Sequence, residues 1–201
     1  MVQHDDKVWY DEATKLEQIC VEAARLLTDS EKVLLLSHFE GTVSRLASLL
    51  RDRAQEYEQF FALNPLELCA AAGAKIWLGA AAAFQKGSRL ANSKSGKVTI
   101  LVADHHPIRS RDQAVIDAAA NLPCQADLCF YFSLDDPVMK RFGADTVKSL
   151  FERLGVSKDE SISHPLVTAA IRNAQEKIES QVNRAVDTHS AEDWLKYNLR
   201  S

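Results

Sequence analysis

Short apolar runs alternate with amphipathic segments along the first two thirds of the chain, and this alternation is the strongest constraint on its fold. Uninterrupted apolar runs of this length are typical of strands that are buried on both faces of a sheet. They cover residues 32–37, 74–79, 97–102 and 128–133. The segments between them repeat apolar residues every three or four positions, which predicts helices over residues 14–27, 41–53 and 111–121. Strands and helices in this order predict an α/β fold with a parallel sheet and helices on both faces.

The remaining elements complete this prediction. We expect the helix over residues 14–27 to open the fold, and residues 55–61 to form a short strand or a helix end. Pro65 starts a further helix that runs through Ala72 and ends at Gly73. Beyond Asp135 the pattern is helical only. The predicted helices there are residues 136–142, 145–154, 164–186 with Ser163 as its cap, and 191–197 with Ser190 as its cap.

Charge and hydropathy exclude several classes of protein. The net charge of -4 is modest, and Lys and Arg form no stripe, so we expect no nucleic-acid partner. Residues 79–84 form one of the longest apolar stretches, far short of the roughly 20 residues that span a bilayer, so we expect no transmembrane segment. The first seven residues are polar and acidic, unlike a secretory signal. The sequence therefore predicts a cytoplasmic protein.

The cysteines agree with this location. Cys20 and Cys69 are far from the others in the sequence, and Cys124 and Cys129 have a C-x4-C spacing with no second pair or nearby His. Such a spacing is poor for zinc. We therefore expect free thiols in a reducing compartment and no metal site.

Several segments near the end of the sheet carry a resemblance to a known family. They read Phe130-Tyr131-Phe132-Ser133-Leu134-Asp135-Asp136, Met139-Lys140-Arg141-Phe142-Gly143, Glu152-Arg153-Leu154-Gly155, Ser163-His164-Pro165-Leu166-Val167 and Ala174-Gln175-Glu176-Lys177-Ile178-Glu179-Ser180. In this order they resemble the preprotein translocase ATPase SecA, at the end of its second motor domain and the start of its helical scaffold. Upstream, residues 33–37 resemble the opening strand of that domain, and residues 102–106 resemble its "GTERH" segment.

The resemblance implies a fold and a division of the chain. It implies a RecA-like domain of the P-loop NTPase superfamily, similar to the second SecA motor domain, over residues 12–135. Residues 136–201 would form a helical tail similar to the start of the SecA scaffold. The first motor domain and the preprotein-crosslinking and wing domains of SecA have no counterpart in the sequence.

The same resemblance implies a degenerate motor domain. Aligned without a gap, the arginines of the family fall on Ile116, Ala118 and Asn121, which carry no positive charge. An arginine that neutralises the transferring phosphoryl group contributes roughly 10³ to 10⁵ in rate. The glycine-arginine-glycine-threonine-aspartate segment of the family falls on residues 80–87, which read AAAAFQKG. The sequence contains no P-loop motif. The most similar segment, Ser95-Gly96-Lys97, precedes a predicted strand, whereas a phosphate-binding loop must follow one. We expect no catalytic residues and no cofactor, and leave ATP or ADP binding open.

These implications lead to a hypothesis of function with two alternatives. The chain is predicted to be a non-catalytic SecA-like module, a binding or regulatory protein related to preprotein translocation. Its expected partners are SecA, the Sec channel or an exported protein, and it would lie in the cytoplasm or peripherally at the inner membrane. One alternative is half of a composite ATPase that a separate P-loop partner completes. The other is a SecA-derived fold with an unrelated role. The sequence leaves the oligomeric state open.

Few residues stand out as candidates for a site. Asp104, His105 and His106 follow a predicted strand, where α/β sheets bind ligands, so they could form a metal or acid-base site. The competing interpretation is a solvated loop residue beside a structural one. Ser37 and His38 could mimic a nucleophile and its base, but lack a nucleophile elbow. Asp135 and Asp136 are interpreted as a helix start.

Three aromatic residues near the ends of the chain are candidates for docking. Trp9, Trp194 and Tyr197 lie outside the predicted sheet, and aromatic residues often anchor interfaces. The alternative is that they pack the termini against the core.

Overall fold

A computed structural model describes residues 4–28, 32–71, 73–84, 96–142, 144–158 and 160–199. At its centre is a six-stranded sheet with the strand order β1-β6-β5-β2-β4-β3, in which every pair of neighbours is parallel. The strands are β1 (His4–Trp9), β2 (Lys32–Ser37), β3 (Tyr57–Phe60), β4 (Lys75–Ala80), β5 (Lys97–Val102) and β6 (Gln125–Ser133). The central strands β2 and β5 are almost wholly buried, which explains their continuous apolar sequences.

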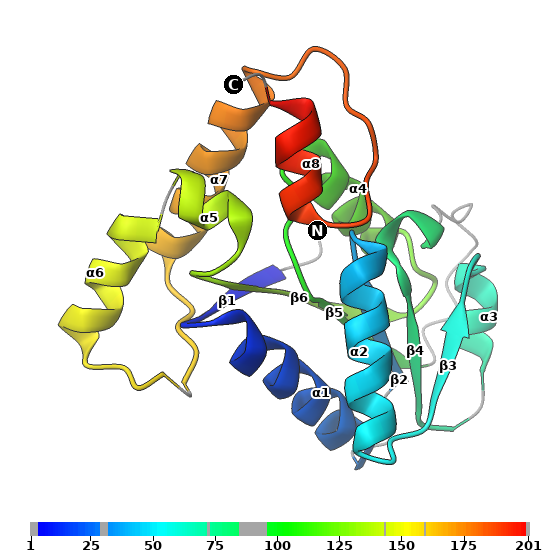
Figure 1. Cartoon of the computed structure of the whole chain (residues 1–201). Helices are drawn as coiled ribbons and strands as arrows, with labels where there is room; N and C mark the ends of the chain where they lie inside the picture. Colours follow the sequence, from blue (N-terminus) through cyan, green and yellow to red (C-terminus); the bar gives the residue numbers. More distant parts are fainter. Residues whose placement is uncertain are drawn as a thin grey trace.

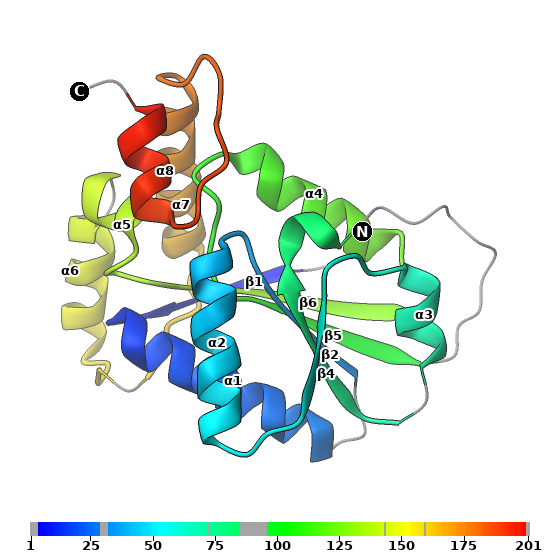
Figure 2. The same cartoon turned by 45° about the vertical axis from the view of Figure 1, so that its right-hand side comes forward.

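Helices cover both faces of the sheet (Figures 1 and 2). On one face, α1 (Glu12–Thr28) and α2 (Glu40–Asp52) contribute Leu16, Ile19 and Leu46 to a core with Leu35 and Leu78 of the strands. On the other face, α3 (Pro65–Ala70) and α4 (Arg109–Ala120) form a second core with the opposite sides of the same strands. This arrangement confirms the predicted α/β fold with a parallel sheet and helices on both faces.

The first strand corrects one prediction. We expected the helix over residues 14–27 to open the fold, but β1 precedes it and pairs with β6 along the edge of the sheet. Its sequence, HDDKVW, has an exposed polar start and becomes buried only toward its end. An edge strand of this kind lacks the continuous apolar run on which the prediction relied. Trp9 therefore belongs to the sheet, contrary to the expectation that it lies outside.

Other element boundaries follow the sequence closely, with two corrections. The ambiguous residues 55–61 contain strand β3, and α3 ends at Ala70, before the predicted end at Ala72, which lies outside the described residues. Helix α7 (Pro165–Glu179) is shorter than the predicted 164–186, and its cap is His164, whose Nδ1 accepts a hydrogen bond from Leu166 N at 3.1 Å. The predicted cap Ser163 is therefore wrong, because the ring nitrogen of His164 takes that role.

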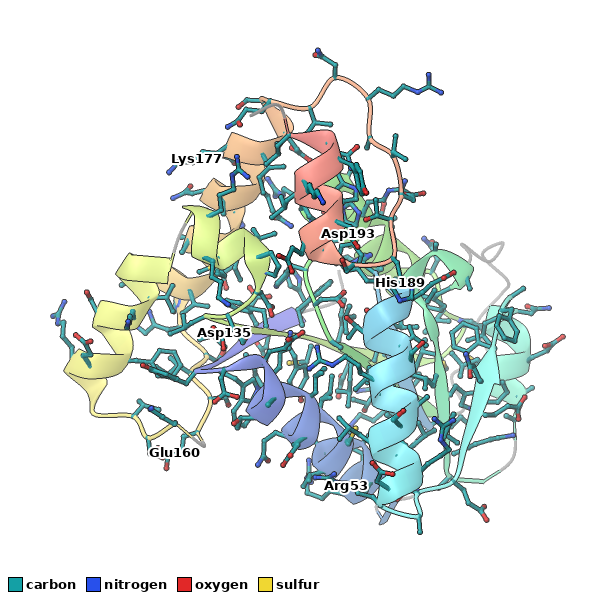
Figure 3. All side chains as sticks on the ribbon, in the orientation of Figure 1. Arg53, Asp135, Glu160, Lys177, His189 and Asp193 are labelled. Atoms are coloured by element: carbon teal, nitrogen blue, oxygen red, sulfur yellow. The ribbon has the colours of Figure 1, made fainter. Side chains whose placement is uncertain are left out.

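The helical tail packs beside the carboxyl ends of the strands (Figure 1). It consists of α5 (Pro137–Phe142), α6 (Ala144–Leu154), α7 and α8 (Ala191–Asn198), which the predicted Ser190 caps. The connection between α7 and α8 reaches the start of α2, where Gly41 N donates a hydrogen bond to His189 O at 3.0 Å. Figure 3 shows His189 at this end of α2. None of the helices in the described part of the chain has the length and apolar character needed to cross a bilayer.

Candidate functional site

The candidate residues lie at the point of the sheet where parallel α/β folds bind ligands. Strands β2 and β5 are neighbours, yet β2 leads into α2 on one face and β5 leads into α4 on the other. Such a change of direction opens a crevice outside the carboxyl ends of the two strands. Ser37 and His38 stand at the end of β2, and Asp104, His105 and His106 follow β5. The structure therefore brings these two predicted groups together.

Asp104 joins the ends of the two strands. Its Oδ2 accepts a hydrogen bond from Ser37 Oγ, and its Oδ1 accepts one from His38 N at 2.7 Å. Burial raises the pKa of Asp104, although the charge of His38 and these hydrogen bonds oppose the rise. Ser37 is fully buried and turned toward Asp104, and the His38 ring contacts Asp112 instead of Ser37. Ser37 and His38 are therefore not arranged as a nucleophile and its base.

Asp112, on the first turn of α4, is the centre of the buried network. Its carboxylate accepts hydrogen bonds from His106 N at 2.9 Å and from Gln175 Nε2 at 2.6 Å. Its Oδ2 lies 2.7 Å from His105 Nδ1, and its Oδ1 lies 2.8 Å from His38 Nε2. Burial alone would raise the pKa of Asp112, but the two histidines lower it well below its usual range. This carboxylate stays ionised at neutral pH.

His105 lies between two carboxylates. Besides Asp112, its Nε2 lies 3.3 Å from Asp6 Oδ1 of β1, and its ring stacks on Phe130 with centroids 4.6 Å apart. Burial lowers the pKa of His105, but Asp112 and Asp6 outweigh that effect and raise it to about 10. His105 is therefore an imidazolium cation at neutral pH. Asp6 in turn accepts a hydrogen bond from Thr168 Oγ1 of α7 at 2.5 Å.

His106 differs from His105 in its charge, although it is the next residue in the chain. Its ring stacks on Phe39 with centroids 5.6 Å apart and meets Trp194 edge-on at 5.3 Å. Its Nδ1 accepts a hydrogen bond from Ile108 N at 2.9 Å, which fixes the acceptor nitrogen. Burial, together with the charge of His38, lowers the pKa of His106 to about 3, so this ring is neutral.

The network ties the helical tail to the sheet. Gln175 of α7 donates to both Asp112 and His106 O, the latter at 2.8 Å, and Thr168 of the same helix donates to Asp6. The sequence left open whether one of the three residues after β5 is solvated, and all of them are largely buried. In the described part of the chain, no group of three or more His, Cys, Asp or Glu side chains is arranged to hold a metal ion. The hydrogen bonds from Thr168 and Gln175 hold α7 against the carboxyl edge of the sheet.

Two clefts border this network. One of about 980 Å³ lies between α1, the start of α2, α5 and α8, and Asp104 and His105 form part of its wall. A buried ion pair crosses that cleft, with Lys15 Nζ 2.8 Å from Asp136 Oδ1. Asp136 also accepts a hydrogen bond from Ser133 N at 3.0 Å, which agrees with its predicted place ahead of a helix. The second cleft, of about 750 Å³, lies between α4, the residues after β4 and the connection from α7 to α8.

The positions that the family resemblance assigns to arginines are on α4 and at its end. Ile116 packs partly buried against the core, and Ala118 is 2% exposed in it. The side-chain amide of Asn121 donates to Asp117 O of its own helix at 2.6 Å. Residues 81–83, in the other family segment, form a short 3-10 helix, and residues 85–87 of that segment lie outside the described residues. The described side chains at these positions provide no positive charge.

The three candidate docking residues differ in exposure. Trp9 is 7% exposed and Trp194 is fully buried, whereas Tyr197 on α8 is 68% exposed. Trp194 packs in a core with Phe39 and Ile178 that holds α8 on the domain. Only Tyr197 therefore presents its ring to a partner in this conformation.

Sequence reasoning missed several members of the network. Asp6 belongs to the unpredicted strand, whereas Lys15 and Gln175 are polar residues on otherwise apolar helix stripes. Gln175 follows Ala174 on the stripe that also holds Ile171 and Ile178, and it is 3% exposed. A polar side chain on a buried helix stripe requires a hydrogen-bond partner, so the position of Gln175 could have indicated a buried polar network.

Fold and site together define an α/β domain with a parallel sheet, in which a buried polar network joins the carboxyl edge to the helical tail. No protein-family model matches the chain. Among solved structures, the C-terminal part of the Fun30 ATPase domain has a TM-score of 0.47 and 11% identity, and covers 83% of this chain and 54% of that one.

Curated relatives show a relationship to SecA. The protein translocase subunit SecA of Acidithiobacillus ferrooxidans is 37% identical over 87 residues, which is 43% of this chain and 10% of the relative. SecA of Caldicellulosiruptor saccharolyticus is 29% identical over 201 aligned positions, covering 90% of this chain and 22% of the relative. The chain thus spans about a tenth to a fifth of the length of these relatives. The chain is thus similar in sequence to part of SecA.

Proposed function

We propose that this chain is a non-catalytic SecA-related module that binds, and thereby regulates, a component of preprotein translocation. The observation that carries this proposal is the state of α4 at the family's arginine positions. Ile116 and Ala118 are apolar and packed, and Asn121 bonds to its own helix. Without a cation there, charge that develops on a transferring phosphoryl group is not neutralised from these positions.

The buried polar network at the carboxyl edge supports the same proposal. There Asp104 is held by His38 N, Asp112 is paired with His105, and Gln175 fixes the tail on Asp112. Opening this edge would leave buried charges without partners, which is costly. The relatives are translocase subunits, so SecA, its channel and exported proteins are the partners we propose. The proposed location is the cytoplasm, peripherally at the inner membrane when bound.

Tyr197 offers a way to test this binding. Its ring is 68% exposed on α8, so removing it changes the surface without opening the core. Purified chain is titrated separately against SecA, channel-containing vesicles and an unfolded preprotein, and binding is measured by fluorescence anisotropy. We expect saturable binding to one of them and weaker binding by Tyr197→Ala. Phe61→Ala is the matched control, because Phe61 is 86% exposed beside β3, at the edge of the sheet away from the tail.

The outcomes separate this proposal from its alternative. Binding to none of the three components would refute a role in translocation. ATP turnover that appears only when a protein with a P-loop is added would favour the composite ATPase instead.

A further inference from the structure

Two of the four cysteines meet at the amino edge of the sheet, opposite the polar network. Cys69 lies on α3, and Cys124 lies in the turn that leads into β6. Cys69 is close enough to Cys124 to contribute to its raised pKa, and both side chains pack against the same core cluster. Cys129 is the cysteine nearest to Cys124 in the sequence, but in the structure the neighbour is Cys69.

The backbone around the two thiols explains their proximity. Lys32, at the start of β2, donates from Nζ to Cys69 O at 2.5 Å. Gly96, just before β5, is so close that a Cβ atom there would lie 4.0 Å from Cys69 O and 3.9 Å from Lys32 Nζ. Gln125 N, next to Cys124, donates to Gly96 O at 3.3 Å. The first residues of β2, β5 and β6 thus bring α3 and the turn before β6 together.

The other two cysteines have different surroundings. Cys20 is fully buried in the core on the opposite face of the sheet. Cys129 is in the middle of β6, with its Sγ 3.7 Å from Phe130 O. Cys69 and Cys124 are each only partly buried, so a small reagent has access to them.

We propose that Cys69 and Cys124 form a thiol-disulfide redox site that low-molecular-weight disulfides such as glutathione disulfide oxidise. Closing this disulfide ties α3 to the start of β6. This proposal is independent of the proposed role in translocation, because it concerns the opposite edge of the sheet.

The order of steps follows from the surroundings of Cys124. Burial and the nearby Cys69 raise the pKa of Cys124 to about 12, so this thiol keeps its proton at first. Cys69 gives its proton to solvent as its sulfur attacks one sulfur of glutathione disulfide, and a glutathione thiolate is expelled. Cys124 then gives its proton to solvent, with Lys32 nearby favouring the thiolate, and attacks the Cys69 sulfur, expelling the second glutathione. Two protein thiols are oxidised and one glutathione disulfide is reduced to two glutathiones.

The test is a redox titration of the folded full-length chain. The protein is equilibrated in glutathione buffers of increasing oxidised fraction, quenched with acid, and alkylated so that free thiols are counted and linked peptides are mapped by mass spectrometry. We expect the four thiols to fall to two, with one peptide pair joining Cys69 to Cys124. Cys129→Ser should still lose two thiols, whereas Cys69→Ser should form no internal disulfide.

Two results would overturn the proposal. One is retention of all four thiols by the folded chain in the most oxidising buffer. The other is a disulfide that involves Cys20 or Cys129, or that joins two chains. Because the wild-type map alone decides between these outcomes, the test does not depend on the folding of a variant.

Discussion

Replacing Asp112 by Asn tests whether the buried network holds the tail on the sheet. The substitution keeps the shape of the side chain and removes the charge that faces His105 at 2.7 Å. It also places an amide group where Gln175 Nε2 now donates at 2.6 Å. His105 would keep only Asp6, at 3.3 Å, as a counter-ion. Removing one partner of a buried ion pair costs about 3–5 kcal/mol, because the other charge stays buried without compensation.

This cost is large against the stability of an ordinary domain, about 5–15 kcal/mol. We therefore expect the midpoint of thermal unfolding to fall by roughly 6–20 °C for a chain of this size. The assay is urea denaturation followed by circular dichroism, with thermal scans beside it. Asp187→Asn is the matched control. Asp187 forms an ion pair with Arg111, which lies next to Asp112 on α4, but the Asp187 side chain is 75% exposed. Such surface pairs contribute only about 0–1 kcal/mol.

A double-mutant cycle isolates the ion pair itself. His105→Gln and Asp112→Asn should destabilise the chain by less together than the sum of their separate effects, with a coupling of about 0.5–3 kcal/mol. Strict additivity, or an Asp112→Asn variant as stable as Asp187→Asn, would refute the argument that these two groups are paired and buried.

Three further predictions concern the same fold. The two histidines predict that stability is greatest near pH ~6.5. The raised pKa of His105, about 10, gives stability that is complete below pH ~6.5 and is lost as pH rises toward that pKa. The lowered pKa of His106, about 3, gives stability that is complete above pH ~6.5 and is lost as pH falls toward that pKa. Urea midpoints between about pH 4 and pH 8 check this, and a curve that keeps rising toward pH 8 would contradict it. Gly79→Ala should cost about 1–3 kcal/mol in denaturant unfolding, since a Cβ atom there would lie 2.6 Å from Phe60 Cζ; an unchanged midpoint would show that the ring moves freely. Trp194→Ala should cost about 3–5 kcal/mol and speed hydrogen exchange in α8, because the side chain is fully buried; protection equal to that of the wild type would show that α8 docks without it.

The strands were predictable because they are buried on both faces. Residues 32–37 and 97–102 were predicted with the bounds that β2 and β5 have, since a central parallel strand is apolar throughout. The edge strand β1 escaped prediction because its first residues are exposed. The end of α7 was placed too far along the chain, because Val182 and Val186 continue an apolar spacing although residues beyond Glu179 leave the helix.

The candidate site was predictable in its location but not in its state. Asp104, His105 and His106 were expected at the end of a strand, where the topology of α/β sheets places ligands. Their burial depends on Asp112 of α4, and on two partners distant in the sequence, Asp6 of β1 and Gln175 of α7. No local pattern reveals such pairing, so the cationic state of His105 and the neutral state of His106 could not be derived from their adjacent positions.

The central proposal is that this chain does not hydrolyse ATP, and ATP turnover by the purified chain tests it most directly. Phosphate release is followed with the wild type and with Arg111→Gln, which alters one of the two exposed arginines of α4. The account predicts that both release phosphate at the rate of the buffer alone. Turnover that elutes with the folded wild-type chain and is lost in Arg111→Gln would contradict it.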